Sequence, residues 1–367
     1  MIVPYEDSIL ASVAAIREYY GLSSSFAPEH RLQKLLQERK PKQIFLILID
    51  AMGANLIEKK LPPEAFARKN MLYKTMTVFP PTTTAATTAI QNGKAPNENA
   101  WLGWCEYFPE VDDTVIPFRG IGYYSDINYG ENYVYDLIPV TSTDEELRQQ
   151  GIPARVLYPA FREDGCASFA EMTERLIGYS HTGEYRYIYA YWDEYDSLMH
   201  KVGPSSPEAD ACLLRINSEL QHLADNLAED TMMIVVADHG QVDIHRDVNL
   251  YYTKYRDYFY RAPSIETRAQ ALFVKEECRE RFEKEFKEEF QDDFVLLSKQ
   301  QVLDTKLFGP HRDHPRFEGL LGDYLAIAKS DVCFSYRKDP AKAFKFAGQH
   351  AGMCPDELYI PLIAYQK

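Results

Sequence analysis

Six aspartate and histidine side chains occur where they could bind metal ions. Three apolar, β-prone segments, "KQIFLILID", "YRYIYAYWDEYD" and "TMMIVVADHG", each end in acidic residues or histidine. The candidate ligands are Asp50, Asp196, His200, Asp238, His239 and, in the glycine-flanked "GQHAGM", His350. Carboxylate and neutral imidazole suit zinc, manganese and similar divalent ions. Each residue alone is more often a turn former or loop residue, but their coincidence at strand ends predicts two neighbouring ions that could clamp a phosphoryl group.

The segment "FPPTTTAATTAIQNG", residues 79–93, adds candidate nucleophiles. Its threonines lie between a double proline and a glycine, in a stretch that is typical of a short helix. A hydroxyl at a helix N-terminus lies beside free backbone N–H groups, which favour anions. A bound metal could lower the pKa of that hydroxyl enough to make it nucleophilic. The alternative is that the threonines only cap and fill the helix.

The elements that must position these residues read as a parallel α/β sheet. Between the second and third apolar segments, "SPEADACLLRINSELQHLADNLAED" has helical spacing of apolar residues, with Ser206 as cap and Pro207 in the first turn. Strand, helix, strand is typical of such a sheet, whose ligands bind beyond the carboxyl ends of the strands. Asp196 and His200 are four residues apart, so both side chains would share one face of a helical turn.

An inserted α+β cap domain is predicted over residues 246–322, which makes the catalytic α/β domain discontinuous, over residues 1–245 and 323–367. Within the insertion, "ALFVK", "EECRERFEKEFKEEF", "DFVLL" and "SKQQVLD" alternate between strand and helix patterns. The last of these begins with a capping box from Ser298 to Gln301.

Composition excludes several classes of function. A formal net charge of −15 disfavours binding of a nucleic-acid polymer, which needs clustered Lys and Arg. No apolar run is long enough for a membrane span, and the N-terminus has no signal-peptide pattern, so a cytoplasmic protein is expected. The six scattered cysteines predict reduced thiols. The oligomeric state is left open.

Five motifs, in order along about residues 43–363, are similar to those of a known family. They are "LIDAMGANLI", "FPPTTTAATTAIQNGKAPNENAWLGW", "WDEYDSLMHKVGP", "VVADHGQVD" and "GQHAGMCPDELYIPLI". Together they resemble the type I phosphodiesterase and nucleotide pyrophosphatase branch of the alkaline phosphatase superfamily. The resemblance implies a three-layer α/β/α sandwich with a small α+β cap, two divalent metal ions, usually zinc with manganese as the alternative, and a phospho-threonine intermediate.

The resemblance also assigns roles to residues. The nucleophile would be Thr83, because the family's nucleophile stands ten residues before the helix-ending glycine, here Gly93, and three after a proline, here Pro80. One metal would be held by Asp50, Thr83, Asp238 and His239, and the other by Asp196, His200 and His350. The small-molecule substrate would be a phosphate ester or nucleotide.

The chain departs from the family where eukaryotic-type members have an asparagine that holds a phosphoryl oxygen. Trp104 stands there, and Asn99 lies nearby but out of register. Tyr123 and Tyr124, in a tyrosine-rich stretch, could stack on a nucleobase, although such residues are more often core material.

The expected activity is that of a phosphodiesterase or nucleotide pyrophosphatase. The alternatives within the superfamily are a phosphomonoesterase, a phosphonate hydrolase and a phosphotransferase or mutase. A catalytically silent metal-binding protein is the non-enzymatic alternative. No cysteine or serine has the C/S-x-P-x-R form that sulfatases need.

Overall fold

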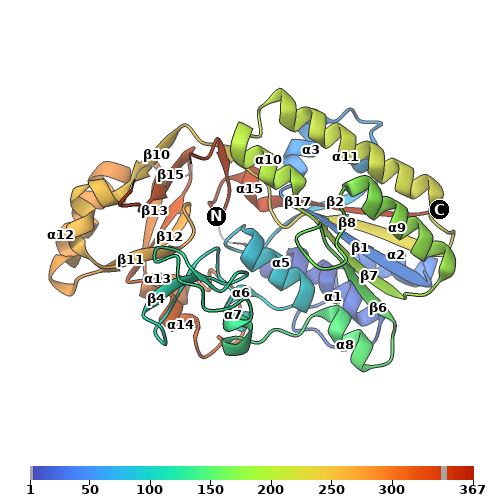
Figure 1. Cartoon of the computed structure of the whole chain (residues 1–367), viewed down its shortest axis with the longest axis horizontal. Helices are drawn as coiled ribbons and strands as arrows, with labels where there is room; N and C mark the ends of the chain where they lie inside the picture. The colour runs from blue at the N-terminus through green and yellow to red at the C-terminus, as the bar shows by residue number, and fades with distance from the viewer. Residues whose placement is uncertain (1–2, 340–344) are drawn as a thin grey trace.

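A six-stranded mixed sheet forms the centre of the protein (Figure 1). The computed structural model describes residues 3–339 and 345–367. In sheet order the strands are β2 (Met71–Met76), β17 (Tyr359–Gln366), β8 (Thr231–Val236), β1 (Gln43–Ile49), β7 (Tyr187–Trp192) and β6 (Ala154–Leu157). The four strands from β8 to β6 are parallel, as the sequence predicts, whereas β17 runs antiparallel to both β8 and β2.

The register brings the ends of the three central strands to one edge. Ile49 of β1 lies opposite Trp192 of β7, and Leu48 lies opposite Val236 of β8. Every residue of these three strands is buried, which explains their continuous apolar sequences. The polar residues that follow them therefore meet at the carboxyl edge of the sheet.

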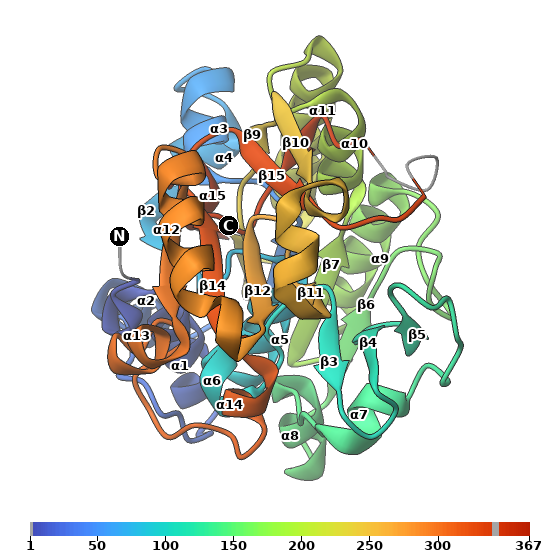
Figure 2. The ribbon, with the colours of Figure 1, turned by 90° about the vertical axis from the view of Figure 1, so that its left-hand side faces the viewer.

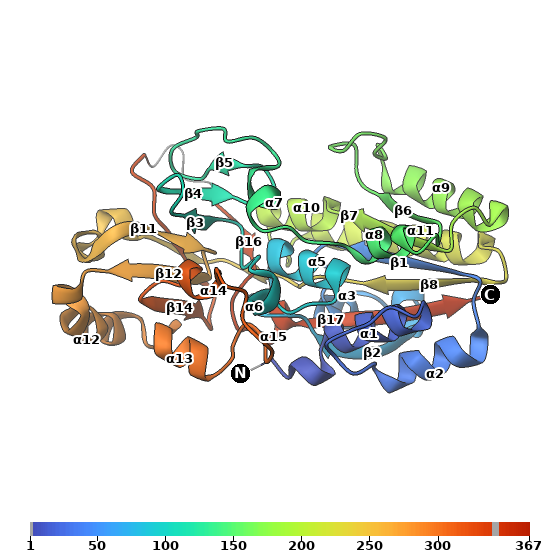
Figure 3. The ribbon, with the colours of Figure 1, turned by 90° about the horizontal axis from the view of Figure 1, so that it is seen from below.

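Helices cover both faces of this sheet, so the predicted three-layer α/β/α class is confirmed (Figure 3). One layer contains α9 (Phe169–Thr182), α10 (Glu194–Val202) and α11 (Pro207–Asn226), with α3 (Ala54–Lys60) and α4 (Phe66–Lys69). The other contains α1 (Ile9–Tyr19), α2 (His30–Arg39), α5 (Thr83–Asn92) and α8 (Thr143–Gln149). Among the described residues, no helix combines the length and apolarity that a membrane crossing needs.

The threonine-rich segment forms α5, with Thr83 as its first residue. The helix ends at Gly93, whose φ of 70° is in the left-handed region that favours glycine. Thr82 occupies the position before the helix but makes no capping hydrogen bond there. Thr87 donates to the Thr83 carbonyl, 2.6 Å away, which fits the expected helix-filling role.

A second sheet forms the cap (Figure 2). Its antiparallel strands are, in order, β11 (Phe259–Ile265), β12 (Ala269–Val274), β14 (Tyr324–Ala328) and β13 (Phe294–Ser298). The helices α12 (Arg279–Phe290) and α13 (Lys299–Asp304) accompany it, and α13 begins with the predicted capping box. A parallel pair, β10 (Arg246–Asn249) and β15 (Val332–Ser335), lies beside it.

The pairing of β14 and β15 bears on the domain boundary. A cap of residues 246–322 would leave both strands in the catalytic domain, yet β14 pairs with β12 and β13, and β15 pairs with β10. We therefore propose that the cap extends to about residue 336, and that the chain re-enters the catalytic domain after it.

The cap sheet has two buried faces. On β12, Leu272 and Val274 belong to an aromatic-rich core under α12, whereas Ala271 and Phe273 belong to the main core. The strand β14 alternates in the same way. Because side chains of a strand point alternately to opposite faces, one sheet closes the cap core and also packs on the catalytic domain.

Short elements complete the chain around the site. A three-stranded sheet joins β3 (Glu106–Phe108), β4 (Asp113–Ile116) and β5 (Ile121–Gly122), and a two-stranded one joins β9 (Val242–Asp243) and β16 (Gly348–Gln349). The short helices are α6 (Pro96–Asn99), α7 (Tyr133–Leu137), α14 (Phe317–Leu320) and α15 (Pro355–Leu358).

A buried ion pair joins the cap to the catalytic domain. Arg268, in the turn between β11 and β12, contacts both carboxylate oxygens of Glu357 in α15, at 2.7 and 2.8 Å. Both side chains are fully buried. The guanidinium also donates to the carbonyl of Val332, at 2.7 Å.

Replacing Arg268 with methionine should destabilise the protein by about 3 to 5 kcal/mol, because Glu357 would be left as a buried charge without its partner. Urea unfolding followed by circular dichroism measures this. The matched control is Lys34→Met, which removes an exposed 3.8 Å pair with Glu38 and should cost less than about 1 kcal/mol. Equal losses in the two variants would contradict a structural role for the buried pair.

Candidate active site

The six candidate ligands form two clusters at the carboxyl edge of the central sheet. One cluster contains Asp50, Asp238 and His239, and the other contains Asp196, His200 and His350. Within each, one ligand atom per residue lies within 4.8 Å of the others. The clusters adjoin, since the rings of His239 and His350 stack with centroids 3.8 Å apart. This division matches the one that the family resemblance implies.

The elements explain this arrangement. Asp50 directly follows β1, and Asp238 follows β8 after one residue. On α10, Asp196 and His200 share one face, with His200 Nε2 3.2 Å from Asp196 Oδ2. His350 follows the short strand β16, which pairs with β9 beyond β8.

Thr83 lies at the first cluster. Its Oγ1 is 3.3 Å from His239 Nε2 and 3.5 Å from Asp50 Oδ2. The residue is half-buried and opens the helix α5, so the positive end of the helix dipole is directed at the same place. Other threonines of the segment have different surroundings: Thr82 Oγ1 donates to Glu266, Thr87 Oγ1 donates to the Thr83 carbonyl, and Thr84 Oγ1 is buried without a hydrogen-bond partner.

The three candidate histidine ligands are oriented in the same way. Each has Nδ1 close to a backbone carbonyl: His200 to Gly348 at 2.9 Å, His239 to Gly240 at 3.0 Å and His350 to Pro81 at 3.1 Å. A carbonyl only accepts, so Nδ1 carries the proton and the Nε2 lone pair is directed into the cluster. Burial, together with neighbouring His239, lowers the pKa of His350 well below its usual range, which keeps that ring neutral.

The carboxylates fit a bound cation. Burial and the neighbouring Asp238 raise the pKa of Asp50 well above its usual range, and burial also raises that of Asp238. Asp50 Oδ1 and Asp238 Oδ2 are buried without a hydrogen-bond partner. Buried carboxylates are normally paired or bound to metal, so a divalent ion would satisfy this donor set.

Hydrogen bonds from neighbouring groups hold the candidate carboxylate ligands in place. Tyr191 donates to Asp50 Oδ2, and the Gln241 amide donates to Asp196 Oδ1. The backbone N–H groups of Ala51 and His239 donate to Asp238 Oδ1, at 3.1 and 3.0 Å. The sequence does not identify Tyr191 or Gln241, although Tyr191 lies in the apolar segment that ends at Asp196 and Gln241 follows His239 after one residue.

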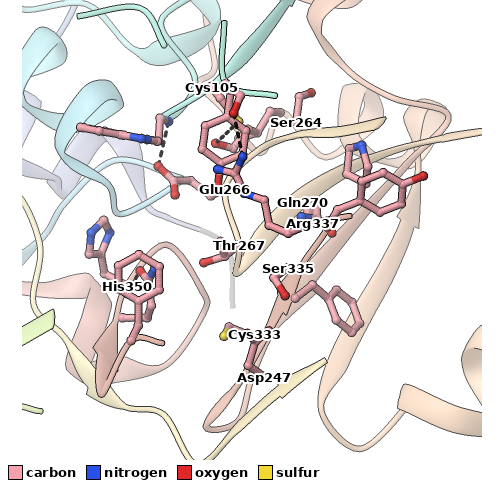
Figure 4. Close-up of a pocket in the computed structure, with 18 of the residues that line it drawn as sticks. Cys105, Asp247, Ser264, Glu266, Thr267, Gln270, Cys333, Ser335, Arg337 and His350 are labelled. Atoms are coloured by element: carbon pink, nitrogen blue, oxygen red, sulfur yellow. Dashed lines mark hydrogen bonds between the residues drawn. The ribbon is translucent and has the colours of Figure 1, made fainter. Parts of the chain in front are cut away.

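A cavity of about 330 Å³ opens beside Thr83, between the clusters and the cap (Figure 4). Trp104, Tyr123 and Tyr124 line it, as expected of substrate-contacting residues. Asn99 does not line it. Its side chain instead accepts from the backbone of Trp101 at 2.9 Å and donates to that of Lys94, which is a local structural role.

Glu266, from the turn between β11 and β12, is a cavity residue that the sequence did not reveal. Its Oε1 accepts from Thr82 Oγ1 at 2.5 Å and from the Trp104 backbone N–H at 2.8 Å. It therefore lies beside the N-terminus of α5 and beside Trp104, which stands where the resemblance implies an asparagine. Burial raises the pKa of this carboxyl to about 7.

The sequence profile described as type I phosphodiesterase / nucleotide pyrophosphatase matches residues 125–343, more than half of the chain. The chain belongs to this family. As a member of it, the protein is a phosphoester hydrolase. The matched segment contains Asp196, His200, Asp238 and His239, whereas Asp50, Thr83 and His350 lie outside it. No curated protein sequence matches the chain.

Solved structures confirm the fold. Murine ectonucleotide pyrophosphatase / phosphodiesterase 5 is 16% identical, with a TM-score of 0.67 over 88% of each chain. The human protein of the same name is 14% identical, with a TM-score of 0.67 over 88% of this chain and 87% of that one. Phosphonoacetate hydrolase from Sinorhizobium meliloti is 13% identical, with a TM-score of 0.62 over 88% of this chain and 90% of its own.

The substitution Asp238→Asn should stabilise the protein in the absence of metal and destabilise it, relative to the wild type, in the presence of metal. Without metal it should raise the melting temperature, because it removes one of three clustered negative charges. With zinc it should be less stable than the wild type, because it loses a ligand. Thermal unfolding in EDTA and in zinc measures both effects. Asp230→Asn, at an exposed residue paired with Lys42, is the control, and an equal zinc response in both variants would contradict a ligand role.

The variant Glu266→Gln should gain stability relative to the wild type as pH rises. The Glu266 carboxyl has a pKa of about 7 in the folded protein and about 4.5 in the unfolded chain. Because the folded state binds the proton more tightly, the wild type is most stable below about pH 4.5 and loses this stabilisation as the pH rises to about 7. Glutamine resembles the neutral acid but has no titrating proton, so the stability of the variant does not change with pH at this position. Between pH 5 and 8 the difference should grow by about 2 kcal/mol in urea unfolding with EDTA. The exposed Glu276→Gln should show no such trend; a flat difference for Glu266→Gln would contradict the raised pKa.

Proposed function

We propose that the protein is a two-metal phosphodiesterase of the nucleotide pyrophosphatase type, acting through a phospho-threonine intermediate on Thr83. The observation that carries this proposal is the position of Thr83 Oγ1, at the N-terminus of α5 and within 3.5 Å of Asp50 and His239. Zinc is the proposed ion, with manganese as the alternative, because the donors are aspartate and histidine.

The residues would divide between two ions. Asp50, Thr83, Asp238 and His239 would hold the first, and the second cluster, Asp196 with His200 and His350, would hold the other. Divalent ions bound there would supply positive charge that favours ionisation of the threonine and of a water and offsets the charge of the phosphoryl group. The orientation of the three histidines, each with Nδ1 at a backbone carbonyl and Nε2 toward the cluster, supports this use.

Two displacements at phosphorus would complete the reaction. Thr83 loses its hydroxyl proton and attacks phosphorus, and the bond from phosphorus to the leaving alcohol or phosphate breaks. Water then attacks the phospho-threonine, and the bond from phosphorus to Thr83 Oγ1 breaks. Each displacement inverts the configuration, so the net result is retention at phosphorus.

Glu266 supports the choice of a diester over a monoester. Above about pH 7 its carboxyl is ionised beside Thr82 and Trp104, in the wall of the cavity. A phosphate monoester is mostly dianionic at neutral pH, because its second pKa is about 6, whereas a diester carries one charge. A nearby carboxylate repels the dianion more strongly, which favours the diester.

A nucleotide is the proposed substrate class. The murine neighbour has been solved as an inactive threonine-to-alanine variant in complex with AMP. In this chain the cavity wall contains Tyr123 and Tyr124, whose rings meet edge to face at 4.9 Å. Aromatic rings in such a wall can contact a nucleobase.

The variant Thr83→Ala should lower kcat for bis-p-nitrophenyl phosphate by at least about a thousandfold, because the nucleophile is removed. Thr83→Ser should retain measurable activity. Acid quenching and peptide mass spectrometry should find phosphate on Thr83 in the wild type. The control is Thr88→Ala, five residues further along the same helix, with activity close to wild type.

Two outcomes would contradict the proposal at different levels. Activity of Thr83→Ala within about tenfold of wild type would remove the threonine mechanism. A strong preference for p-nitrophenyl phosphate or for a phosphonate would instead replace the diester with one of the alternative substrates of the superfamily. Transfer of phosphate to an added acceptor alcohol in preference to water would identify a phosphotransferase.

A further inference from the structure

A second cavity lies at the edge of the central sheet that β6 forms, on the side of α8 (Figure 1). This β6 cavity has a volume of about 330 Å³ and is lined by residues of α8 and β6, by the loop after β6 and by Tyr185, which precedes β7. It shares no lining residue with the cavity beside Thr83. A ligand bound here would therefore contact neither metal cluster.

Arg155, on β6, lines the β6 cavity, and its charge is unpaired. Its Nε is buried without a hydrogen-bond partner, and no carboxylate of the described residues forms an ion pair with it. The guanidinium carbon lies 5.6 and 5.8 Å from the ring centroids of Tyr179, on α9, and of Tyr185, and Nη1 donates to the Tyr185 hydroxyl at 3.4 Å. A charged donor that is buried without a partner is costly, so this guanidinium suits an anionic acceptor.

Further donors reach the β6 cavity from the other helix layer. Arg148, near the end of α8, pairs with Asp144 at 2.7 Å and donates to the carbonyl of Ala154 at 3.4 Å, which brings its guanidinium to the edge of β6. The carbonyl of Pro153 accepts from backbone N–H groups at the start of β7. Since backbone groups alternate along a strand, Ala154 and Val156 turn theirs away from β7, toward the open edge. The N–H of Val156 is thus a donor beside the two arginines.

The acidic residues of the β6 cavity leave this positive charge in place. Glu163 and Asp164, in the loop after β6, are exposed and form no ion pair with any described residue. Water and salt screen exposed charges, so both carboxylates act only weakly on a group inside the cavity. Asp144 pairs with Arg148, but this bond and the one to Ala154 both come from Nη1, so Nε and Nη2 can donate to a ligand.

We propose that the β6 cavity binds a compact oxyanion, either a phosphate-type group or a carboxylate, between Arg148 and Arg155. A guanidinium forms paired, charge-assisted hydrogen bonds with both kinds of anion, and the N–H of Val156 offers a further donor. The site lies outside the cavity beside Thr83 and does not depend on the proposed function. In a chain with a formal net charge of −15, an anion binds where positive charge is concentrated, and two arginines supply it here.

Calorimetric titration with sodium sulfate and with sodium acetate tests this site. Sulfate represents a phosphate-type dianion without precipitating zinc, and acetate represents a carboxylate. Sodium chloride keeps the ionic strength constant, because salt screens charges. The protein is used as purified, and again after EDTA has stripped any metal and has itself been removed.

At least one of the two anions should bind the stripped protein, and Arg155→Gln should weaken that binding by about tenfold or more, the loss typical of one charge-assisted hydrogen bond. Arg155→Lys should bind with intermediate affinity, because it keeps the charge without the fork of donors. The double variant Glu163→Gln, Asp164→Asn should bind the anion more tightly, because it removes negative charge from the rim. Tighter binding of sulfate identifies a phosphate-type group, and tighter binding of acetate identifies a carboxylate.

Arg256→Gln is the matched control. Arg256 also lies over a tyrosine ring, that of Tyr251 at 4.2 Å, but it lines neither cavity. This variant should bind the anion as the wild type does. Thermal unfolding in chloride alone shows whether each variant is folded, and the double variant at the rim tests the site with both arginines intact.

Three outcomes would overturn the inference, and they can be told apart. If neither anion binds the stripped wild type or the purified protein, water fills the β6 cavity. If an anion binds but Arg155→Gln and the double variant bind it as the wild type does, it lies elsewhere on the surface. If binding disappears when metal is stripped, the anion lies at the metal clusters, so the inference fails while the proposed function stands.

Discussion

The buried pair of Arg268 and Glu357 is the contact on which the arrangement of the site depends. The carboxylate of Glu357 accepts four hydrogen bonds, two from Arg268 and one each from the backbone N–H groups of Gly352 and Cys354. Its own backbone carbonyl accepts from Gly240. Arg268 is two residues from Glu266, Gly352 two from His350, and Gly240 directly follows His239. This ion pair and its hydrogen bonds therefore hold together the three segments that contain Glu266, His350 and His239.

Charge is the second constraint. Three aspartates lie in two adjoining clusters at one edge of the sheet, with Glu266 nearby in the cavity wall. In the described part of the chain, Arg337 is the only lysine or arginine that lines the cavity. An anionic phosphoester would be repelled unless positive charge is added. The unpartnered oxygens of Asp50 and Asp238 indicate where that charge would be bound.

The family, the fold class and the clustering of the ligands could be predicted because each depends on local patterns. A buried strand followed by aspartate indicates a position at the carboxyl edge, and parallel register then brings Asp50 and Asp238 together. Thr83 could be identified because it is the first residue of a helix whose end is marked in the sequence by Gly93. Its catalytic role stays a prediction.

Glu266, Arg337 and the end of the cap could not be predicted, because each depends on contacts between distant segments. Glu266 meets Thr82 across 184 residues of sequence, and Arg337 meets Tyr123 across 214. The sequence "GDYLAIAKS" reads as a buried strand whichever sheet it joins, so only pairing with β12 and β13 assigns it to the cap. The predicted substrate contact of Asn99 was wrong because a short polar side chain near a loop can hydrogen-bond to the backbone of a turn as readily as to a ligand.

The two-faced cap sheet affects how substrate reaches the site. Ala271 and Phe273 of β12, with Leu325 and Ile327 of β14, belong to the main hydrophobic core. Swinging the cap away as a rigid body would expose these side chains at about 25 cal/mol for each Å² of apolar surface. A rigid-body opening of the cap would therefore be costly, because the sheet that closes the cap core also contributes to the main core.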